Sequence, residues 1–216
     1  MRNMIVAPQP TAVEAGARVL MDGGNAVDAA VTCALVQSIV SPHSCGIGGY
    51  AILILHLAEA GESGSVRGLD APALAGSKVS PDMWEDRIIR PNPDGWGYFL
   101  EGRVNDVGYR SICAPGTVKA LSTMLERWGT ISWPEAIEPA ARVAEEGFTV
   151  DSHLAMAWKG EPKYPEGAAP LDYVRSNPEA GRIYLQEDGT PYAAGETLKN
   201  PDYAQTLRLL AERSPE

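Results

Sequence analysis

Residues 26–39 constrain the fold more than any other stretch, because they are apolar on almost every side of a helix. Asn25 precedes them as a candidate N-cap, and Asp28 places a negative charge at the positive end of that helix. A helix without a polar face has to be covered by other elements on nearly all sides. The stretch is too short to cross a bilayer, and Asp28 and Gln37 interrupt it. We therefore expect a central buried helix in a globular domain.

A second apolar run, residues 51–55, has the length of a strand and predicts burial on both faces. A further strand is expected to pair with it over residues 64–70. A helix over residues 11–22, opened by a capping box of Thr11 and Glu14, is expected to lie beside the central helix on one side of this sheet. This mixture of elements predicts an α/β (α+β) fold.

The rest of the chain shows no internal repeat, and we expect residues 1–216 to form one unit without an internal boundary. Glycine and proline punctuate residues 90–110, which predicts a long loop there. A capping box at Ser132 and Glu135 predicts the start of another helix. The other expected elements are helices at 118–128, 132–147 and near 203–210, and a small hairpin from 183–185 through a turn at 188–189.

Charge and cysteine usage exclude several classes of function. The formal net charge is −10, and no basic stripe is present, which excludes nucleic acid and anionic membranes as main partners. The three cysteines are widely spaced and form no C-x-x-C pair, which argues against a disulfide framework or a structural zinc site. The N-terminus has no signal-type apolar core, so the sequence predicts a cytoplasmic protein. A leader that had been removed would instead indicate a periplasmic or extracellular one.

The loop Gly46-Ile47-Gly48-Gly49-Tyr50-Ala51 fits the letters of the dinucleotide fingerprint G-x-G-x-x-G/A. A dinucleotide loop requires a strand before it and a helix after it, so that the helix N-terminus faces the pyrophosphate. Here the order is helix, loop, strand, and we expect no nucleotide cofactor. The glycines are expected to allow positive φ angles or a close approach of another segment.

His43 and Cys45 precede this loop and could suggest a metal ligand or a nucleophile. The other histidines, His56 and His153, share no ligand spacing with them, so we expect no metal site. A Cys–His nucleophile stays open in principle, but Cys45 has no identifiable orienting partner, and a packed thiol is the expectation. No residue of this chain is predicted to be catalytic.

Three further motifs follow one another along the chain: Gly23-Gly24-Asn25-Ala26-Val27-Asp28-Ala29-Ala30, Gly46-Ile47-Gly48-Gly49 and Pro115-Gly116-Thr117-Val118. Taken in this order, they resemble the large subunit of the γ-glutamyltranspeptidase family. The resemblance implies an N-terminal nucleophile hydrolase with an αββα sandwich, of which only the N-terminal portion is present. It also implies a proenzyme that cuts itself into a heterodimer.

In that family the new N-terminal threonine of the small subunit is the nucleophile, and its own α-amine is the base. It forms a γ-glutamyl ester that water or an acceptor amine resolves, with glutathione as one donor. The family's Thr-Thr-His context is absent here, because Thr11, Thr117, Thr149 and Thr206 all lie elsewhere. The resemblance therefore implies a small-molecule amide as substrate, and the protein's own small subunit as partner.

The family's large subunit also supplies an arginine, in a stretch like Asp-x-Arg-Glu-x-Ala-Pro, that grips the substrate α-carboxylate. Aligned without gaps, that position falls on Pro72; aligned on Ala71-Pro72, it falls on Gly68. Arg67 is the nearest cation and the candidate substrate-binding residue. Strand alternation, however, puts its side chain on the opposite face from Gly68, which favours an exposed surface charge.

Three functions remain open from the sequence. The first is the N-terminal part of a γ-glutamyltranspeptidase-like amide hydrolase or transferase, acting on glutathione or other γ-glutamyl or acyl amides, whose catalytic half is missing and which is inactive alone. The second is a family member that acts on amides without an α-amino acid head. The third is a non-catalytic homologue that serves for binding or scaffolding.

Overall fold

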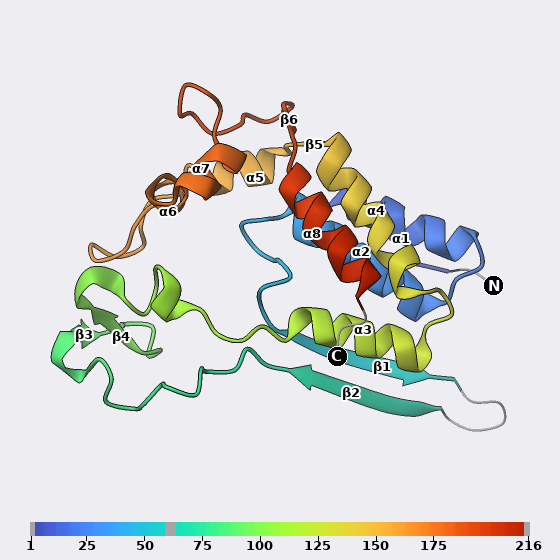
Figure 1. The fold of residues 1–216 in the computed structure, drawn as a ribbon, viewed down its shortest axis with the longest axis horizontal. Helices are drawn as coiled ribbons and strands as arrows, with labels where there is room; N and C mark the ends of the chain where they lie inside the picture. The colour runs from blue at the N-terminus through green and yellow to red at the C-terminus, as the bar shows by residue number, and fades with distance from the viewer. Residues whose placement is uncertain (1–2, 59–63, 214–216) are drawn as a thin grey trace.

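The computed structural model describes residues 3–58 and 64–213 (Figure 1). The helices are α1 (Pro10–Met21), α2 (Ala26–Val40), α3 (Thr117–Trp128), α4 (Trp133–Glu146), α5 (Ser152–Ala157), α6 (Pro170–Ser176), α7 (Pro178–Tyr184) and α8 (Pro201–Glu212). The strands are β1 (Ala51–Leu57), β2 (Ser65–Ala71), β3 (Ile88–Pro91), β4 (Tyr98–Leu100), β5 (Phe148–Thr149) and β6 (Thr197–Leu198). Within this described part the strands form three antiparallel pairs, β1–β2, β3–β4 and β5–β6.

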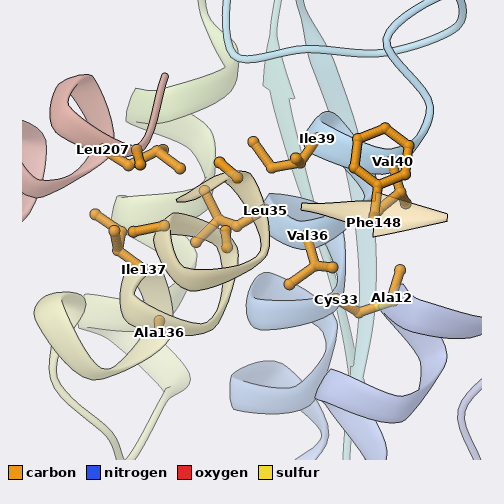
Figure 2. Close-up of a cluster of buried hydrophobic side chains, with 14 of the residues drawn as sticks. Ala12, Cys33, Leu35, Val36, Ile39, Val40, Ala136, Ile137, Phe148 and Leu207 are labelled. Atoms are coloured by element: carbon orange, nitrogen blue, oxygen red, sulfur yellow. The ribbon is translucent and has the colours of Figure 1, made fainter. Parts of the chain in front are cut away.

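Four helices, α1, α2, α4 and α8, form what we call the helical body. Helix α2 packs against α1 and α4, and α8 packs against α4. Figure 2 shows side chains of all four helices meeting in one apolar cluster. Val31 and Leu35 of α2 are only 0% and 1% exposed. The prediction of a central buried helix is confirmed.

Local capping was predicted correctly at two helices and wrongly at one. The Asn25 side chain accepts hydrogen bonds from the first amides of α2, and Ser132 and Glu135 form a reciprocal capping box at α4. The box expected at Thr11 is absent, because α1 begins at Pro10 and its N-cap, Gln9, makes no side-chain capping bond. Proline has the φ angle of a first helical residue, so the helix starts earlier and Thr11 falls inside its first turn.

The β1–β2 hairpin has one packed face and one open face. Helix α3 lies against it, and Leu53 and Leu55 pack against the core. The alternate residues Ile52 and Ile54 are 67% and 80% exposed. The prediction that this strand is buried on both faces is therefore wrong for the described residues, because no described element covers the outer face.

Residues 80–111 and 161–176 pack together as a unit that we call the distal lobe (Figure 1). The long loop expected at residues 90–110 is wrong in part, because β3, β4 and short 3-10 turns lie within it. The Arg90 guanidinium donates to both carboxylate oxygens of Glu166, at 2.7 Å each, and lies 4.6 Å from the centre of the Phe99 ring. Polar and cation–π contacts thus hold this lobe together, with little buried apolar area.

The expected C-terminal hairpin is also wrong in part, because Tyr184 ends helix α7 and only an isolated bridge joins Leu185 to Pro191.

None of the helices in residues 3–58 and 64–213 combines the length and the apolar character that a bilayer crossing requires.

Candidate functional site

The second and third motifs, residues 46–49 and 115–118, meet at the C-terminal end of β2, in what we call the strand-end junction. The Gly49 carbonyl accepts hydrogen bonds from the amides of Gly116, at 2.8 Å, and Thr117, at 3.3 Å. A Cβ atom on Gly116 would lie 2.5 Å from the Ala71 carbonyl oxygen and 2.8 Å from that of Pro72. Only glycine fits there, so Gly116 fixes how closely the start of α3 approaches the end of β2.

The glycines of the loop before β1 behave differently from the expectation. None of Gly46, Gly48 and Gly49 has a positive φ angle. A Cβ atom on Gly46 or Gly48 would have no neighbour within 4 Å among the described residues. The prediction of positive φ or close approach is therefore wrong for these two, and nothing in the described residues explains them.

Arg67, the candidate substrate-binding residue, lies on β2 opposite Leu55, whereas Gly68 lies opposite Ile54. The two positions therefore face opposite sides of the hairpin, as alternation predicts. Arg67 is exposed, and its Nη1 donates only a 3.3 Å bond to the neighbouring Val66 carbonyl. No ion pair of Arg67 is found in the described part of the chain.

Pro72, the other position expected for the arginine, directly follows β2 and is exposed. Its carbonyl lies against Gly116 in the strand-end junction. Neither Gly68 nor Pro72 carries a cationic side chain, and Arg67 lies on the packed face of the hairpin with Leu55, opposite the face of Gly68. The end of β2 therefore lacks a guanidinium where the resemblance implies one.

Asp28, from the first motif, is fully buried and joins α2 to the segment between α3 and α4. Its carboxylate accepts from the Thr130 amide at 2.7 Å, the Thr130 hydroxyl at 2.5 Å and the Asn25 amide at 2.8 Å. Burial raises the pKa of Asp28, but these bonds and one from the Ile131 amide outweigh it, and the pKa is lowered overall. The sequence indicated only the helix-end role of Asp28, because Thr130 and Ile131 lie 102 and 103 residues away.

His43 and His153, which share no sequence spacing, are brought together by the fold. Their ring centroids lie 5.1 Å apart with an edge-on geometry. In the described residues, however, no three histidine, cysteine or acidic side chains are grouped as metal ligands. Two imidazoles without a third ligand do not make a zinc site of ordinary geometry.

Cys45 is placed as a donor and not as a nucleophile. Its Sγ donates weakly to the carbonyls of Gln37, at 3.3 Å, and Ser41, at 3.5 Å. Cys45 is an exposed residue, so the expectation of a packed thiol is wrong. Partial burial of the thiol nevertheless raises the pKa of Cys45 and outweighs the effect of its bond to Ser41. The thiol therefore stays protonated near neutral pH, which does not favour a reactive thiolate.

A cavity of about 210 Å³ lies beneath the glycine loop, between Cys45, Ile47 and Thr117. The Thr117 hydroxyl is buried and has no hydrogen-bond partner in the described structure. Ligand pockets typically measure about 300–1,000 Å³, so this cavity is too small for a drug-sized substrate. The cavity that borders the strand-end junction at Thr117 is therefore too small to be a substrate pocket by itself.

Comparison with known proteins supports the same motifs. Residues 12–216 match the model of the family described as Gamma-glutamyltranspeptidase. This chain belongs to the γ-glutamyltranspeptidase family. It is 30% identical to the glutathione hydrolase proenzyme of Bacillus subtilis strain 168, over 98% of the chain and 32% of that protein. It is 32% identical to the acylase ACY 1 proenzyme of Pseudomonas sp. strain V22, over 100% of the chain and 36% of that protein.

Solved structures of the family share the fold. The γ-glutamyltranspeptidase of Helicobacter pylori matches with a TM-score of 0.80 at 25% identity, over 98% of this chain and 56% of that one. The cephalosporin acylase of Bacillus halodurans matches with a TM-score of 0.72 at 25% identity, over 94% of this chain and 34% of that one. The expected N-terminal nucleophile hydrolase fold is confirmed. The chain spans about a third of the length of the curated family members that it matches.

Proposed function

We propose that this chain is the N-terminal portion of the large subunit of an amide hydrolase or acyltransferase, and that residues 1–216 are one partial domain. Its share of the family members' length supports this, since about two thirds of them lie outside the match. The open face of the β1–β2 hairpin supports it as well, because exposed Ile52, Ile54 and Val66 need a covering element.

The catalytic threonine belongs, in this proposal, to a small subunit that self-cleavage releases. A free α-amine next to the threonine hydroxyl serves as its base, so the large subunit need not supply a catalytic residue. The family's Thr-Thr-His context is absent from residues 1–216. We therefore expect the isolated 216 residues to have no amidase activity and to aggregate readily. Turnover of a γ-glutamyl anilide by the purified fragment would refute this.

The substrate that the geometry supports best is an amide whose acyl group is not gripped through an α-carboxylate. The observation that carries this is the end of β2, where Gly68 and Pro72 offer no cation and Arg67 faces the other side. Losing a bidentate, charge-assisted pair in a partly desolvated pocket costs about 2–5 kcal/mol, or about 30-fold to several thousand-fold in affinity. Similarity to a protein named an acylase supports the same substrate class.

Four anilides test this in the protein as its gene encodes it. The γ-glutamyl anilide has both carboxylate and ammonium groups, the glutaryl anilide only the carboxylate, the 4-aminobutyryl anilide only the ammonium, and the pentanoyl anilide neither. We expect removal of the carboxylate to change kcat/KM by less than about tenfold, well below the loss that a guanidinium clamp would cause.

Substitutions separate the two remaining explanations. Gly68→Arg and Pro72→Arg are expected to favour the carboxylate-bearing anilides, and Arg67→Ala is the matched control that should leave the ranking unchanged. A strong preference for the γ-glutamyl anilide that Arg67→Ala abolishes would show that Arg67 is the clamp and that a glutathione hydrolase is the better description. The same preference with no effect of Arg67→Ala would place the clamp in the rest of the protein.

A further inference from the structure

His43 and His153 connect two segments that are far apart in the chain. His43 lies in the segment of residues 41–50, between α2 and β1, and His153 lies in the first turn of α5. Their rings meet edge-on, with the centroids 5.1 Å apart and the planes inclined by 61°. The contact therefore joins the glycine loop to α5.

The surroundings of His43 suit a neutral imidazole. Both of its ring nitrogens are buried and have no hydrogen-bond partner in the described structure. A second proton would add an N–H donor with no acceptor to receive it, which is costly in a buried position. The titratable groups that act on it are His153 of α5 and Asp151, the N-cap of that helix. The Asp151 Oδ1 already accepts a hydrogen bond from the Leu154 amide at 2.7 Å.

The pKa of His43 follows from these surroundings. Burial lowers it, the neighbouring His153 lowers it further, and the Asp151 carboxylate offsets a part of the shift. A histidine whose pKa is lowered in the packed state takes up its proton more readily when that state opens. The packed state is thus favoured fully above the ordinary histidine pKa of about 6.5 and is lost progressively as the pH falls below it.

The segment that His43 anchors is also attached to α2, α3 and α8. Cys45 Sγ donates weakly to the Gln37 carbonyl of α2 at 3.3 Å, and the Ile47 amide donates to the Tyr203 hydroxyl of α8 at 3.3 Å. The Gly49 carbonyl accepts from the first amides of α3. Release at His43 would leave the segment held by these hydrogen bonds. Protonation of the His43 ring would therefore loosen residues 41–50, which lie next to the strand-end junction.

We propose that the His43–His153 contact is a pH-sensitive latch that holds residues 41–50 against α5 near neutral pH and releases them in mildly acidic solution. This proposal does not rest on the proposed enzymatic function, because it concerns only groups within the described chain.

Amide hydrogen exchange tests the latch in the protein as its gene encodes it. Exchange of residues 43–50 is measured at pH 7.5 and 5.5, and each rate is corrected for the intrinsic pH dependence of exchange. We expect protection to fall by up to about tenfold at pH 5.5, since each pH unit below the released-state pKa can change the equilibrium by that factor. In His43→Gln the protection should be independent of pH, and in His153→Gln the change should be smaller than in the wild type.

The matched control is His56→Gln, which removes a histidine of β1 and should leave the pH response of residues 43–50 intact. Should His43→Gln fail to fold, the nuclear magnetic resonance titration of His43 in the wild-type protein decides the matter. A His43 pKa at or above 6.5, or a pH response that persists unchanged in His43→Gln, would overturn the proposal.

Discussion

The helical body and the β1–β2 hairpin each contain an apolar segment, α2 and β1, but only α2 is enclosed. Val31 and Leu35 of α2 are 0% and 1% exposed, whereas Ile52 and Ile54 of β1 are 67% and 80% exposed. The body finds all its covering elements within the chain, while the outer face of the hairpin finds none among the described residues. The described residues therefore enclose α2 but leave one face of the hairpin, which ends at the strand-end junction, uncovered.

The largest effect is expected in the body, from Asp28→Ala. The substitution leaves the amides of Asn25, Thr130 and Ile131 without their buried acceptor. We expect the free energy of unfolding to fall by about 3–5 kcal/mol, measured by urea denaturation. Asp22→Ala, an exposed carboxylate at the end of α1, is the matched control and should stay within about 0.5 kcal/mol of the wild type. Equal effects of the two substitutions would contradict the role assigned to Asp28.

The same carboxylate predicts how the body responds to acid. Because the pKa of Asp28 is lowered from 3.8 in the folded protein, its ionised form contributes stability that is present above pH 3.8. That contribution is lost as the pH falls through the lowered pKa. Asp28→Asn should lack this component, so the stability difference between wild type and variant should narrow between pH 5 and pH 2. A difference that stays constant over this range would count against the hydrogen-bonded carboxylate.

Two neighbouring residues of β1 test the difference between the packed face and the open face within a single strand. Leu53 packs against the core and Ile54 is 80% exposed. We expect Leu53→Ala to lower the free energy of unfolding by about 1–3 kcal/mol and Ile54→Ala to change it by less than about 0.5 kcal/mol in the 216-residue chain. In the longer protein that we propose, Ile54→Ala should become as costly as Leu53→Ala. If Ile54→Ala stays neutral there, the outer face is not a packing surface.

The closed part of the fold could be predicted from sequence because its signals are local. The all-round apolar α2 spans 15 residues, and the Asn25 cap and the Ser132 box each span a single helical turn. The outer face of β1 could not be predicted, because an apolar run indicates burial but not whether its cover lies within the same residues. The short strands β3 and β4 were hidden by the glycines and prolines around them, which predict loops wherever strands are brief.

The candidate site divides in the same way. Alternation along β2 predicted that Arg67 and Gly68 face opposite sides, which the register confirms. The contact of His43 with His153 and the bonds of Asp28 to Thr130 could not be predicted, since each joins residues about 100 positions apart with no shared period. The sequence identified Gly116 only as part of a motif and did not predict its structural role. That role, a close approach to Ala71, depends on how α3 packs against β2.

The distal lobe differs from both regions because polar and cation–π contacts hold it together. Glu166→Gln removes the bidentate acceptor of Arg90, whose side chain is 35% exposed. Since partly exposed ion pairs are screened by water and salt, we expect global stability to change little. Local opening should nevertheless increase, seen as several-fold faster trypsin cleavage within residues 90–110, and added salt should reproduce part of the effect in the wild type. Glu161→Gln, an exposed acid of the same lobe with no ion pair in the described residues, is the control.

The smallest effect on stability is expected from Arg67→Ala in β2. Arg67 is exposed, and its described contact is a 3.3 Å bond to the adjacent Val66 carbonyl, so little is lost when the side chain is removed. We expect the free energy of unfolding to stay within about 0.5 kcal/mol of the wild type. In the mature enzyme that we propose, the ranking of the four anilides should also be unchanged, because Arg67 and Gly68 lie on opposite faces of the hairpin. The charge-reversed variant Arg67→Glu makes the test stricter. If the guanidinium contacts the substrate, its replacement by a carboxylate should lower kcat/KM for the carboxylate-bearing anilides far more than truncation to alanine does. Equal, small effects of both variants would show that the end of β2 selects its substrate without a cation from this chain.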